Sequence, residues 1–183
     1  MSNLGKWERW YSMLGEDPEP YGDSPSYQLA ADFVKGLAVA DWGCGKGWMR
    51  RFITPELYHG VDGSASPFAD EVVDLTDYHT PSPAIILRHV LEHDYNWKLI
   101  LRNAVAAAQQ RLVVVLFTPP VDVTTVIAFN DEPSVPDIAF NVDDIIDEMH
   151  NFNVVCLEQP SERTQYKVET MIYATRMYEG LRR

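Results

Sequence analysis

The chain has 183 residues, of which 46% are hydrophobic and 23% charged, as expected for one folded domain spanning 1–183. Its formal net charge of −12 makes nucleic acid an unlikely partner, because an acidic surface repels phosphate backbones. Residues 1–14 lack the apolar core of a signal peptide, and no apolar run approaches a membrane span. Cys44 and Cys156 have no metal-ligand spacing. We therefore expect a cytoplasmic protein with reduced thiols, no metal and no membrane contact.

The first 23 residues are rich in aromatic residues and prolines, and they precede a regular core over 24–176. A short helix over 6–14 would place Trp7, Trp10 and Tyr11 on one face. Two interpretations stay open for this segment. Its rings either dock the N-terminus on the core or form a lid over a binding site.

A helix is predicted directly after this segment. Ser24 and Pro25 form an N-cap followed by proline at the first helical position, and apolar residues then recur at helical spacing. Gly36 can end the helix in the left-handed conformation. The chain would then enter a short buried strand over 37–40.

Apolar runs and helical patterns alternate along the rest of the chain, which predicts parallel strands with helices on both faces. Residues 118–140 contain four prolines and read as a long irregular loop. No helix separates the last two strands, so these should pair antiparallel. The expected strands are 37–40, 57–61, 71–75, 84–87, 112–117, 153–157 and 168–174, and the expected helices after the first strand are 48–53, 97–108 and 141–149.

A glycine-rich turn follows the first strand, in the sequence Ala40-Asp41-Trp42-Gly43-Cys44-Gly45-Lys46-Gly47. Glycine permits positive φ and close approach of a ligand to the backbone. The pattern differs from G-x-G-x-x-G, and Lys46 is not followed by Ser or Thr as in a phosphate loop. Asp41 would repel a pyrophosphate but favour a cation. Asp62, which ends the next strand, can hold ribose hydroxyls, and S-adenosylmethionine satisfies both requirements.

This turn resembles the first motif of class I S-adenosylmethionine-dependent methyltransferases. The resemblance continues over 24–176 through Gly60-Val61-Asp62-Gly63-Ser64 (second motif), Asp74-Leu75 (third motif) and Leu87-Arg88-His89-Val90-Leu91-Glu92-His93, which is similar to the fourth motif of the small-molecule, Leu-Glu-His branch. It implies an α/β, Rossmann-like, seven-stranded and mostly parallel sheet of order 3-2-1-4-5-7-6, with the last strand antiparallel. The implied reaction transfers a methyl group and leaves S-adenosylhomocysteine.

The resemblance also implies roles for individual residues. Asp41 and the glycine-turn backbone would face the methionine part, and Asp62 would hold the ribose. The adenine would lie against Asp74 and Leu75, and Trp42 would pack against either the cofactor or the core. The expected cofactor-binding residues are Asp41, Trp42, Gly43, Cys44, Gly45, Gly47, Asp62, Gly63, Ser64, Asp74, Leu75, Arg88 and His89.

Two histidines are candidates for catalysis. Methyl transfer mostly requires that the nucleophile be placed in line with the sulfonium, but a hydroxyl or ammonium acceptor must also lose a proton. His89 and His93 are the candidate bases, because histidine titrates near neutral pH. Alternatively, both brace the helix that follows.

The acceptor is expected to be an O or N nucleophile of a small molecule. The Asp/Asn-Pro-Pro-aromatic motif of base-methylating enzymes is absent after the fourth strand, and Thr118-Pro119-Pro120-Val121 follows the fifth strand without the acid or the aromatic residue. Three alternatives remain: a lyase or polyamine-type enzyme with the same cofactor, a tRNA-directed or other nucleic-acid-directed methyltransferase, and a binding module. The chain is expected to be a monomer or a homodimer.

Overall fold

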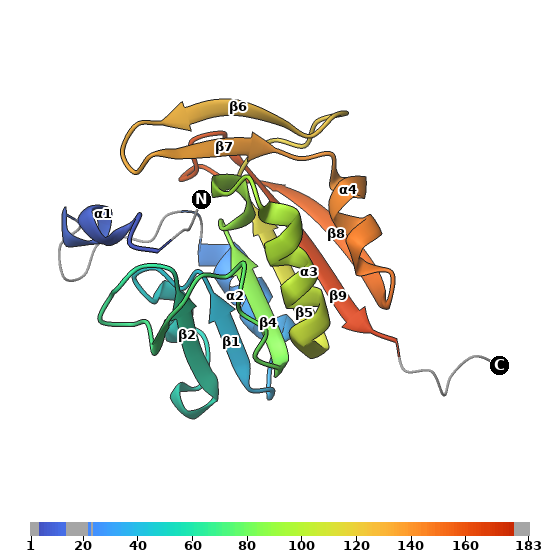
Figure 1. Cartoon of the computed structure of the whole chain (residues 1–183). Helices are drawn as coiled ribbons and strands as arrows, with labels where there is room; N and C mark the ends of the chain where they lie inside the picture. The colour runs from blue at the N-terminus through green and yellow to red at the C-terminus, as the bar shows by residue number, and fades with distance from the viewer. Residues whose placement is uncertain (1–3, 14–21, 23, 178–183) are drawn as a thin grey trace.

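The computed structural model describes residues 4–13, 22 and 24–177. A seven-stranded sheet of order β3-β2-β1-β4-β5-β9-β8 forms its centre (Figure 1). Strand β9 is antiparallel to both of its neighbours, and the remaining neighbours pair in parallel. The expected strand order is therefore confirmed. The strands are β1 (Val39–Trp42), β2 (Tyr58–Asp62), β3 (Glu71–Val72), β4 (Ser82–Arg88), β5 (Ala108–Leu116), β8 (Phe152–Pro160) and β9 (Val168–Arg176).

Helices cover both faces of this sheet. Helix α2 (Ser24–Phe33) packs on one face, and α3 (Trp97–Ala107) and α4 (Val142–Ile146) pack on the other (Figure 1). Successive side chains of β4 alternate between the two resulting cores: Ile85 faces α3, and Ile86 faces α2, both fully buried. This two-sided burial explains the unbroken apolar runs 84–87 in β4 and 112–116 in β5. Among the described residues, no helix has the length and apolar character needed to cross a bilayer.

The helix ends follow local hydrogen-bonding rules. Asn141 is the N-cap of α4, as predicted, and its side chain accepts a hydrogen bond from the Asp143 N–H at 3.0 Å. A 3₁₀ turn, η4 (Asp147–Met149), continues α4. Asn96 is the N-cap of α3 without a side-chain capping hydrogen bond, and in the turn before it Asp94 Oδ1 accepts the Asn96 N–H at 2.6 Å. The short predicted helix after the glycine turn is the 3₁₀ turn η1 (Trp48–Arg51), followed by η2 (Pro55–Leu57).

The interpretation of residues 118–140 as an irregular loop is wrong. This segment contains an antiparallel hairpin of β6 (Thr125–Asn130) and β7 (Val135–Ala139), which lies beyond the ends of the main strands (Figure 1). All five residues of β7 are buried, and β7 packs against η3 (Leu91–His93). A strand that contains a proline and a buried acid lacks the usual sequence pattern. Asp137 is tolerated there because Asn130 and Tyr166 donate hydrogen bonds to its carboxylate.

The amphipathic pattern of α3 yields a test of the core. Leu101 is fully buried, whereas Leu99 on the same helix is 46% exposed. We expect Leu101→Ala to lower the free energy of unfolding by about 2–5 kcal/mol, since it removes apolar contacts and leaves a cavity. The matched Leu99→Ala should change it by no more than about 0.5 kcal/mol. Urea denaturation measures both, and equal losses would contradict the assignment of the buried face.

Candidate functional site

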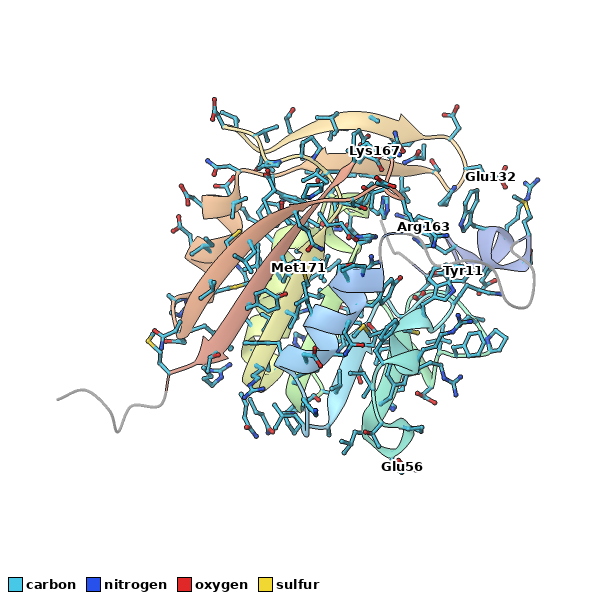
Figure 2. The ribbon with its side chains drawn as sticks, turned by 180° about the vertical axis from the view of Figure 1, so that it is seen from behind. Tyr11, Glu56, Glu132, Arg163, Lys167 and Met171 are labelled. Carbon is cyan, nitrogen blue, oxygen red and sulfur yellow. The ribbon has the colours of Figure 1, made fainter. Side chains whose placement is uncertain are left out.

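A cavity of about 610 Å³ lies where β1, β2 and β4 end and the chain turns away from the sheet. Its wall combines segments that are far apart in the sequence. Figure 2 shows Tyr11, Glu132 and Arg163, three of the lining residues, on the same side of the molecule. The lining residues are Trp7, Trp10, Tyr11, Tyr27, Asp41, Gly43, Cys44, Gly45, Trp48, Met49, Asp62, Gly63, Leu75, Arg88, His89, Val90, His93, Phe117, Asn130, Glu132, Pro133, Asp137, Arg163 and Gln165.

The glycine turn forms one wall of the cavity. Gly43, Gly45 and Gly47 have φ of 78°, 54° and 68°, a left-handed conformation that side chains oppose. A Cβ added at Gly43 would also collide with a methyl group of Val90. The N–H groups of Gly43 and Cys44 both donate to the carbonyl oxygen of Val61, at 2.7 and 3.1 Å. The turn is therefore held against β2, and glycine is required at its first position.

Two buried carboxylates flank this turn. Asp41 accepts a hydrogen bond from the Tyr58 hydroxyl at 2.7 Å. Asp62 accepts from the backbone N–H groups of Gly45 and Ser64, both at 2.8 Å. Burial raises the pKa of Asp41 to about 7, and the hydrogen bond from Tyr58 only partly opposes this. Burial also raises the pKa of Asp62, against those backbone hydrogen bonds. A site with two such acids favours a cation.

The N-terminal helix α1 (Glu8–Met13) and the residues before it border the same cavity. The Tyr11 hydroxyl donates to Asp62 Oδ2 at 3.3 Å, and the Trp7 N–H donates to Ser64 Oγ at 2.9 Å. Burial and the Asp62 charge hold the pKa of Tyr11 well above its ordinary value, so the hydroxyl remains a donor. The rings of Trp7, Trp10 and Tyr11 all line the cavity. Leu14 and the rest of the segment up to 21 lie outside the described residues.

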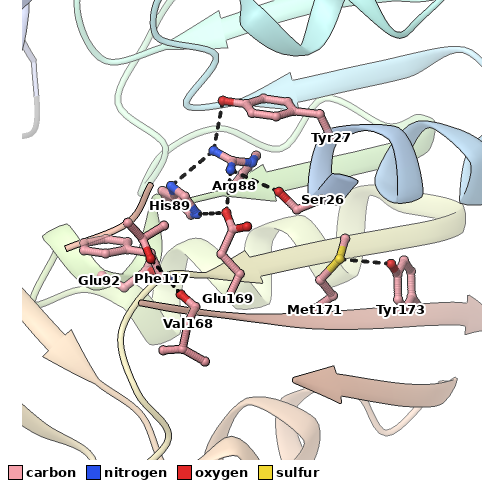
Figure 3. A network of polar contacts seen from close by, with 11 residues as sticks. Ser26, Tyr27, Arg88, His89, Glu92, Phe117, Val168, Glu169, Met171 and Tyr173 are labelled. Atoms are coloured by element: carbon pink, nitrogen blue, oxygen red, sulfur yellow. Dashed lines mark hydrogen bonds and ion pairs between the residues drawn. The ribbon is translucent and has the colours of Figure 1, made fainter. Parts of the chain in front are cut away.

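A buried ionic network borders the cavity, which its members Tyr27, Arg88 and His89 line (Figure 3). Arg88 Nη2 donates to Glu169 Oε1 at 2.5 Å, and Arg88 Nη1 lies 2.9 Å from the Tyr27 hydroxyl oxygen. The Arg88 and Glu169 side chains are only 7% and 0% exposed. Gly22 passes beside them with φ of 89°, and a Cβ there would overlap both side chains. The network joins α2, β4 and β9.

Both ring nitrogens of His89 contact members of this network. Its Nδ1 lies 3.1 Å from Arg88 Nη1, and its Nε2 lies 3.0 Å from Glu169 Oε1. A guanidinium can only donate, so Nδ1 accepts, and the ring proton is on Nε2, facing Glu169. Burial, the Arg88 charge and the His93 charge all hold the pKa of His89 well below its ordinary value. His89 is therefore a neutral ring with both nitrogens engaged.

His93 has a different environment. Its Nδ1 lies 3.0 Å from the carbonyl oxygen of Pro136 and 3.4 Å from Asp137 Oδ1. The Asp137 carboxylate also accepts hydrogen bonds from Asn130 and the Tyr166 hydroxyl, both at 2.8 Å. Burial alone would raise the pKa of Asp137, but the hydrogen bonds from His93, Tyr166 and Asn130 outweigh it and leave that pKa lowered. Asp137 is therefore an anion beside the His93 ring.

Glu92, which lies between these two histidines in the sequence, has a structural role. It is fully buried, and its Oε1 accepts the Phe117 N–H at 2.7 Å. Burial raises the pKa of Glu92 to about 7. The hydrogen bond fixes η3 to the end of β5, which sets the position of His93.

Most, but not all, of the residues predicted from the sequence line the cavity. Trp42 does not: it is fully buried and lies edge-on to Tyr78 in the core under α3, because it points to the opposite face of β1 from Asp41. Gly47, Ser64 and Asp74 do not line it either, and Asp74 Oδ1 instead accepts the N–H and hydroxyl of Thr76. The predicted residues that do line it are Asp41, Gly43, Cys44, Gly45, Asp62, Gly63, Leu75, Arg88, His89 and His93.

The far wall is formed by two segments outside the predicted cofactor site. Asn130, Glu132 and Asp137 come from the unrecognised hairpin, and Arg163 and Gln165 come from the connection between β8 and β9. No motif marks these positions, since they reach the cavity only through tertiary packing. Within the described part of the chain, no cluster of His, Cys, Asp or Glu could hold a metal ion.

Comparison with known proteins identifies the fold. No protein-family model matches the sequence, and no curated protein does either. Among solved structures, 1,6-didemethyltoxoflavin-N1-methyltransferase from Burkholderia thailandensis, with bound 1,6-didemethyltoxoflavin and S-adenosylhomocysteine, superposes with a TM-score of 0.66 at 12% identity over 85% of this chain and 80% of that one. Magnesium protoporphyrin IX methyltransferase from Synechocystis PCC 6803, with S-adenosylhomocysteine, gives 0.58 at 14% identity over 93% and 94%.

A chain from the complex between the Haloferax volcanii Trm112 methyltransferase activator and a protein assigned as its methyltransferase gives a TM-score of 0.60 at 8% identity, over 94% of this chain and 96% of that one. At these identities the likeness shows a shared fold. The chain has the Rossmann-like class I methyltransferase fold. Its place in the Leu-Glu-His branch stays a prediction.

The raised pKa of Asp41 yields a pH test. In the unfolded chain an aspartate titrates near pH 3.9, and in the folded chain Asp41 titrates at about 7. The folded state therefore binds more protons in this window, so Asp41 lowers stability as the pH rises from about 4 to 7. We expect Asp41→Asn to gain stability relative to the unchanged protein over this window, as measured by urea denaturation at a series of pH values. The control Asp32→Asn, at an exposed position on α2, should show no such trend, and a flat difference for Asp41→Asn would contradict burial of the charge.

Proposed function

We propose that this protein is an S-adenosylmethionine-dependent methyltransferase that acts on an O or N nucleophile of a small molecule. The observation that carries the proposal is the pair of buried carboxylates, Asp41 and Asp62, on either side of a positive-φ glycine turn at the carboxyl end of β1. The shared fold supports it, because two of the solved structures that it resembles hold S-adenosylhomocysteine in such a fold.

The residues present fit this cofactor. Asp41 is buried, and its carboxylate accepts one hydrogen bond from the described residues, that of Tyr58. An ammonium or sulfonium ligand would favour its ionised form and offset the cost of burial. Asp62 Oδ2 accepts a hydroxyl hydrogen bond from Tyr11, which a ribose hydroxyl could replace. Asp41 and the glycine turn would hold the methionine part, Asp62 and Gly63 the ribose, and Leu75 the adenine.

The bound cofactor supplies a methyl group already activated on a sulfonium, so the protein contributes mainly position and exclusion of water. Trp7, Trp10 and Tyr11 cover the cavity from the N-terminal side, and we propose residues 1–23 as a lid on the 24–176 core. Arg88 and Glu169 fix the wall that their network borders. His89, with both nitrogens engaged, serves to position Arg88, and His93 is left as the candidate base.

A small acceptor fits better than a nucleic acid. The cavity of about 610 Å³ lies within the range of small-molecule sites. The net charge of −12 opposes a polyanion. The enzymes from Burkholderia and Synechocystis in the comparison are named for small ring compounds.

We further propose that the protein is cytoplasmic and acts as a monomer or homodimer.

Calorimetric titration with S-adenosylmethionine tests the proposal. We expect micromolar binding, which Asp62→Ala should weaken by about 10–100-fold because it removes charged hydrogen bonds. The control Asp77→Ala, at an exposed position outside the cavity, should bind as the unchanged protein does. No binding at millimolar cofactor would refute the proposal. Release of S-adenosylhomocysteine from a pool of small metabolites then separates methyl transfer from a lyase or polyamine-type reaction.

The pH dependence of binding provides a second check. A cation beside Asp41 favours its ionised form, so binding should release a proton at pH values below its pKa of about 7. Affinity for S-adenosylmethionine should therefore rise between about pH 5 and 7, and Asp41→Asn should reduce this rise. Titrations in buffers of different ionisation enthalpy measure the released proton directly. An affinity that falls over this range would show that the cation does not lie near Asp41.

A further inference from the structure

Three aromatic rings from separate segments meet on the cavity wall. The His93 ring lies edge-on to Trp7, with centroids 5.0 Å apart, and beside Phe117 at 5.2 Å. Phe117 in turn stacks on Tyr166 at 5.9 Å. Trp7, His93 and Phe117 all line the cavity. Such a wall suits a flat ring, because aromatic groups gain from stacked and edge contacts beyond the burial of their area.

The tautomer of His93 follows from its contacts. The carbonyl oxygen of Pro136, 3.0 Å from Nδ1, can only accept a hydrogen bond, so the proton of a neutral His93 is on Nδ1. The lone pair is then on Nε2, on the side of the ring away from Pro136. Among the described residues, none makes a hydrogen bond to Nε2. His93 therefore presents a proton acceptor at the cavity wall, which His89 does not.

Asp137 is placed to assist that acceptor. It is 1% exposed, its Oδ1 lies 3.4 Å from His93 Nδ1, and hydrogen bonds from Asn130 and Tyr166 fix its orientation. Those hydrogen bonds hold the pKa of Asp137 low, so it is an anion. An anion beside Nδ1–H stabilises the imidazolium that forms when Nε2 takes a proton.

Resting on the function proposed above, we propose that the acceptor is a flat aromatic or heteroaromatic molecule with an ionisable hydroxyl or ring N–H, that His93 Nε2 takes its proton, and that Asp137 positions His93. As the acceptor lone pair bonds to the methyl carbon, the carbon–sulfur bond breaks and its electron pair stays on sulfur. The acceptor proton passes to Nε2 and then to solvent. The products are the methylated acceptor, S-adenosylhomocysteine and one proton.

The acidity of the acceptor agrees with this assignment. A phenolic hydroxyl has a pKa of about 10, within reach of an imidazole base, whereas an aliphatic hydroxyl is far less acidic. Trp7 and Phe117 also place aromatic rings beside His93, where they would contact a flat acceptor. An aromatic hydroxyl is thus acidic enough for an imidazole base, and its ring suits the aromatic wall.

NMR of protein labelled with ¹⁵N-histidine tests the base without any acceptor. We expect His93 in the Nδ1–H tautomer, assigned through the signals lost in His93→Gln. A proton on Nε2 instead would overturn the assignment. This result does not depend on the cofactor, so it is separate from failure of the proposed function, which calorimetry with S-adenosylmethionine reports.

Release of S-adenosylhomocysteine tests the acceptor class. The probes are catechol, 5-hydroxyindole and 7-hydroxycoumarin, compared with glycerol and glucose. We expect turnover of one or more aromatic probes and none of the aliphatic ones. If S-adenosylmethionine binds but none of the aromatic probes is methylated, or if only aliphatic hydroxyls are, the acceptor class is wrong.

Variants test the roles on an accepted probe. His93→Gln should lower kcat by about 10²–10⁴-fold with unchanged affinity for S-adenosylmethionine, and added imidazole should partly restore His93→Gly. An acidic phenol such as 4-nitrophenol, ionised in mildly alkaline buffer, should lose much less, because it needs no base. A uniform loss across weakly and strongly acidic acceptors would indicate a structural role for His93. His150→Gln, at an exposed position, is the control and should have unchanged kcat.

Asp137→Asn should lower kcat with little change in KM, whereas Asp143→Asn, at an exposed position, should change neither. Because Asp137 is buried, thermal melting must show that the variant folds. If it does not, Tyr166→Phe gives the second test, since it removes one hydrogen bond to Asp137 and keeps the carboxylate. We expect that variant to retain most of its kcat. Full activity of folded Asp137→Asn would overturn the positioning role.

Discussion

Arg88 and Glu169 are opposite charges that the fold withdraws from water, and a buried charge of this kind is tolerated only when it has a partner. Their contact at 2.5 Å joins the end of β4 to β9, the one antiparallel strand of the sheet. Tyr27 and Ser26 of α2 complete the arrangement (Figure 3). Removing either charge would leave the other unpaired beside the cavity, so this wall of the site and the packing of α2 depend on one interaction.

This network also separates the two histidines of the fourth motif. His89 follows Arg88 directly and takes a positive φ of 56°, which turns its ring into the ionic network. His93 lies one 3₁₀ turn later, where Glu92 fixes η3 to the end of β5 and the hairpin provides Asp137. The same residue type thus has two different environments within five positions, because different segments pack against the two rings.

Two regions of the cavity differ in their electrostatic character. Burial raises the pKa values of Asp41 and Asp62, which is the condition under which a cationic ligand gains most. Next to His93 the wall presents the rings of Trp7 and Phe117, and the Asp137 carboxylate beside it already accepts hydrogen bonds from Asn130 and Tyr166. The carboxylates of the first region favour a cationic ligand, and the rings of the second favour contact with another flat ring.

Local sequence patterns predict the sheet and the glycine turn that follows β1. Apolar runs such as 84–87 fix buried strands, and glycine with positive φ at Gly43 is a local requirement that leaves a local signal. The prediction from the sequence is wrong at 118–140, because β7 contains a proline and a buried acid. That acid is tolerated only through distant partners, including Tyr166. Likewise, neither the core position of Trp42 nor the pairing of Arg88 with Glu169, 81 positions away, follows from any nearby residue. The backbone conformation of a turn depends on neighbouring residues in the sequence. Whether a charge can be buried depends instead on the distant segment that packs against it.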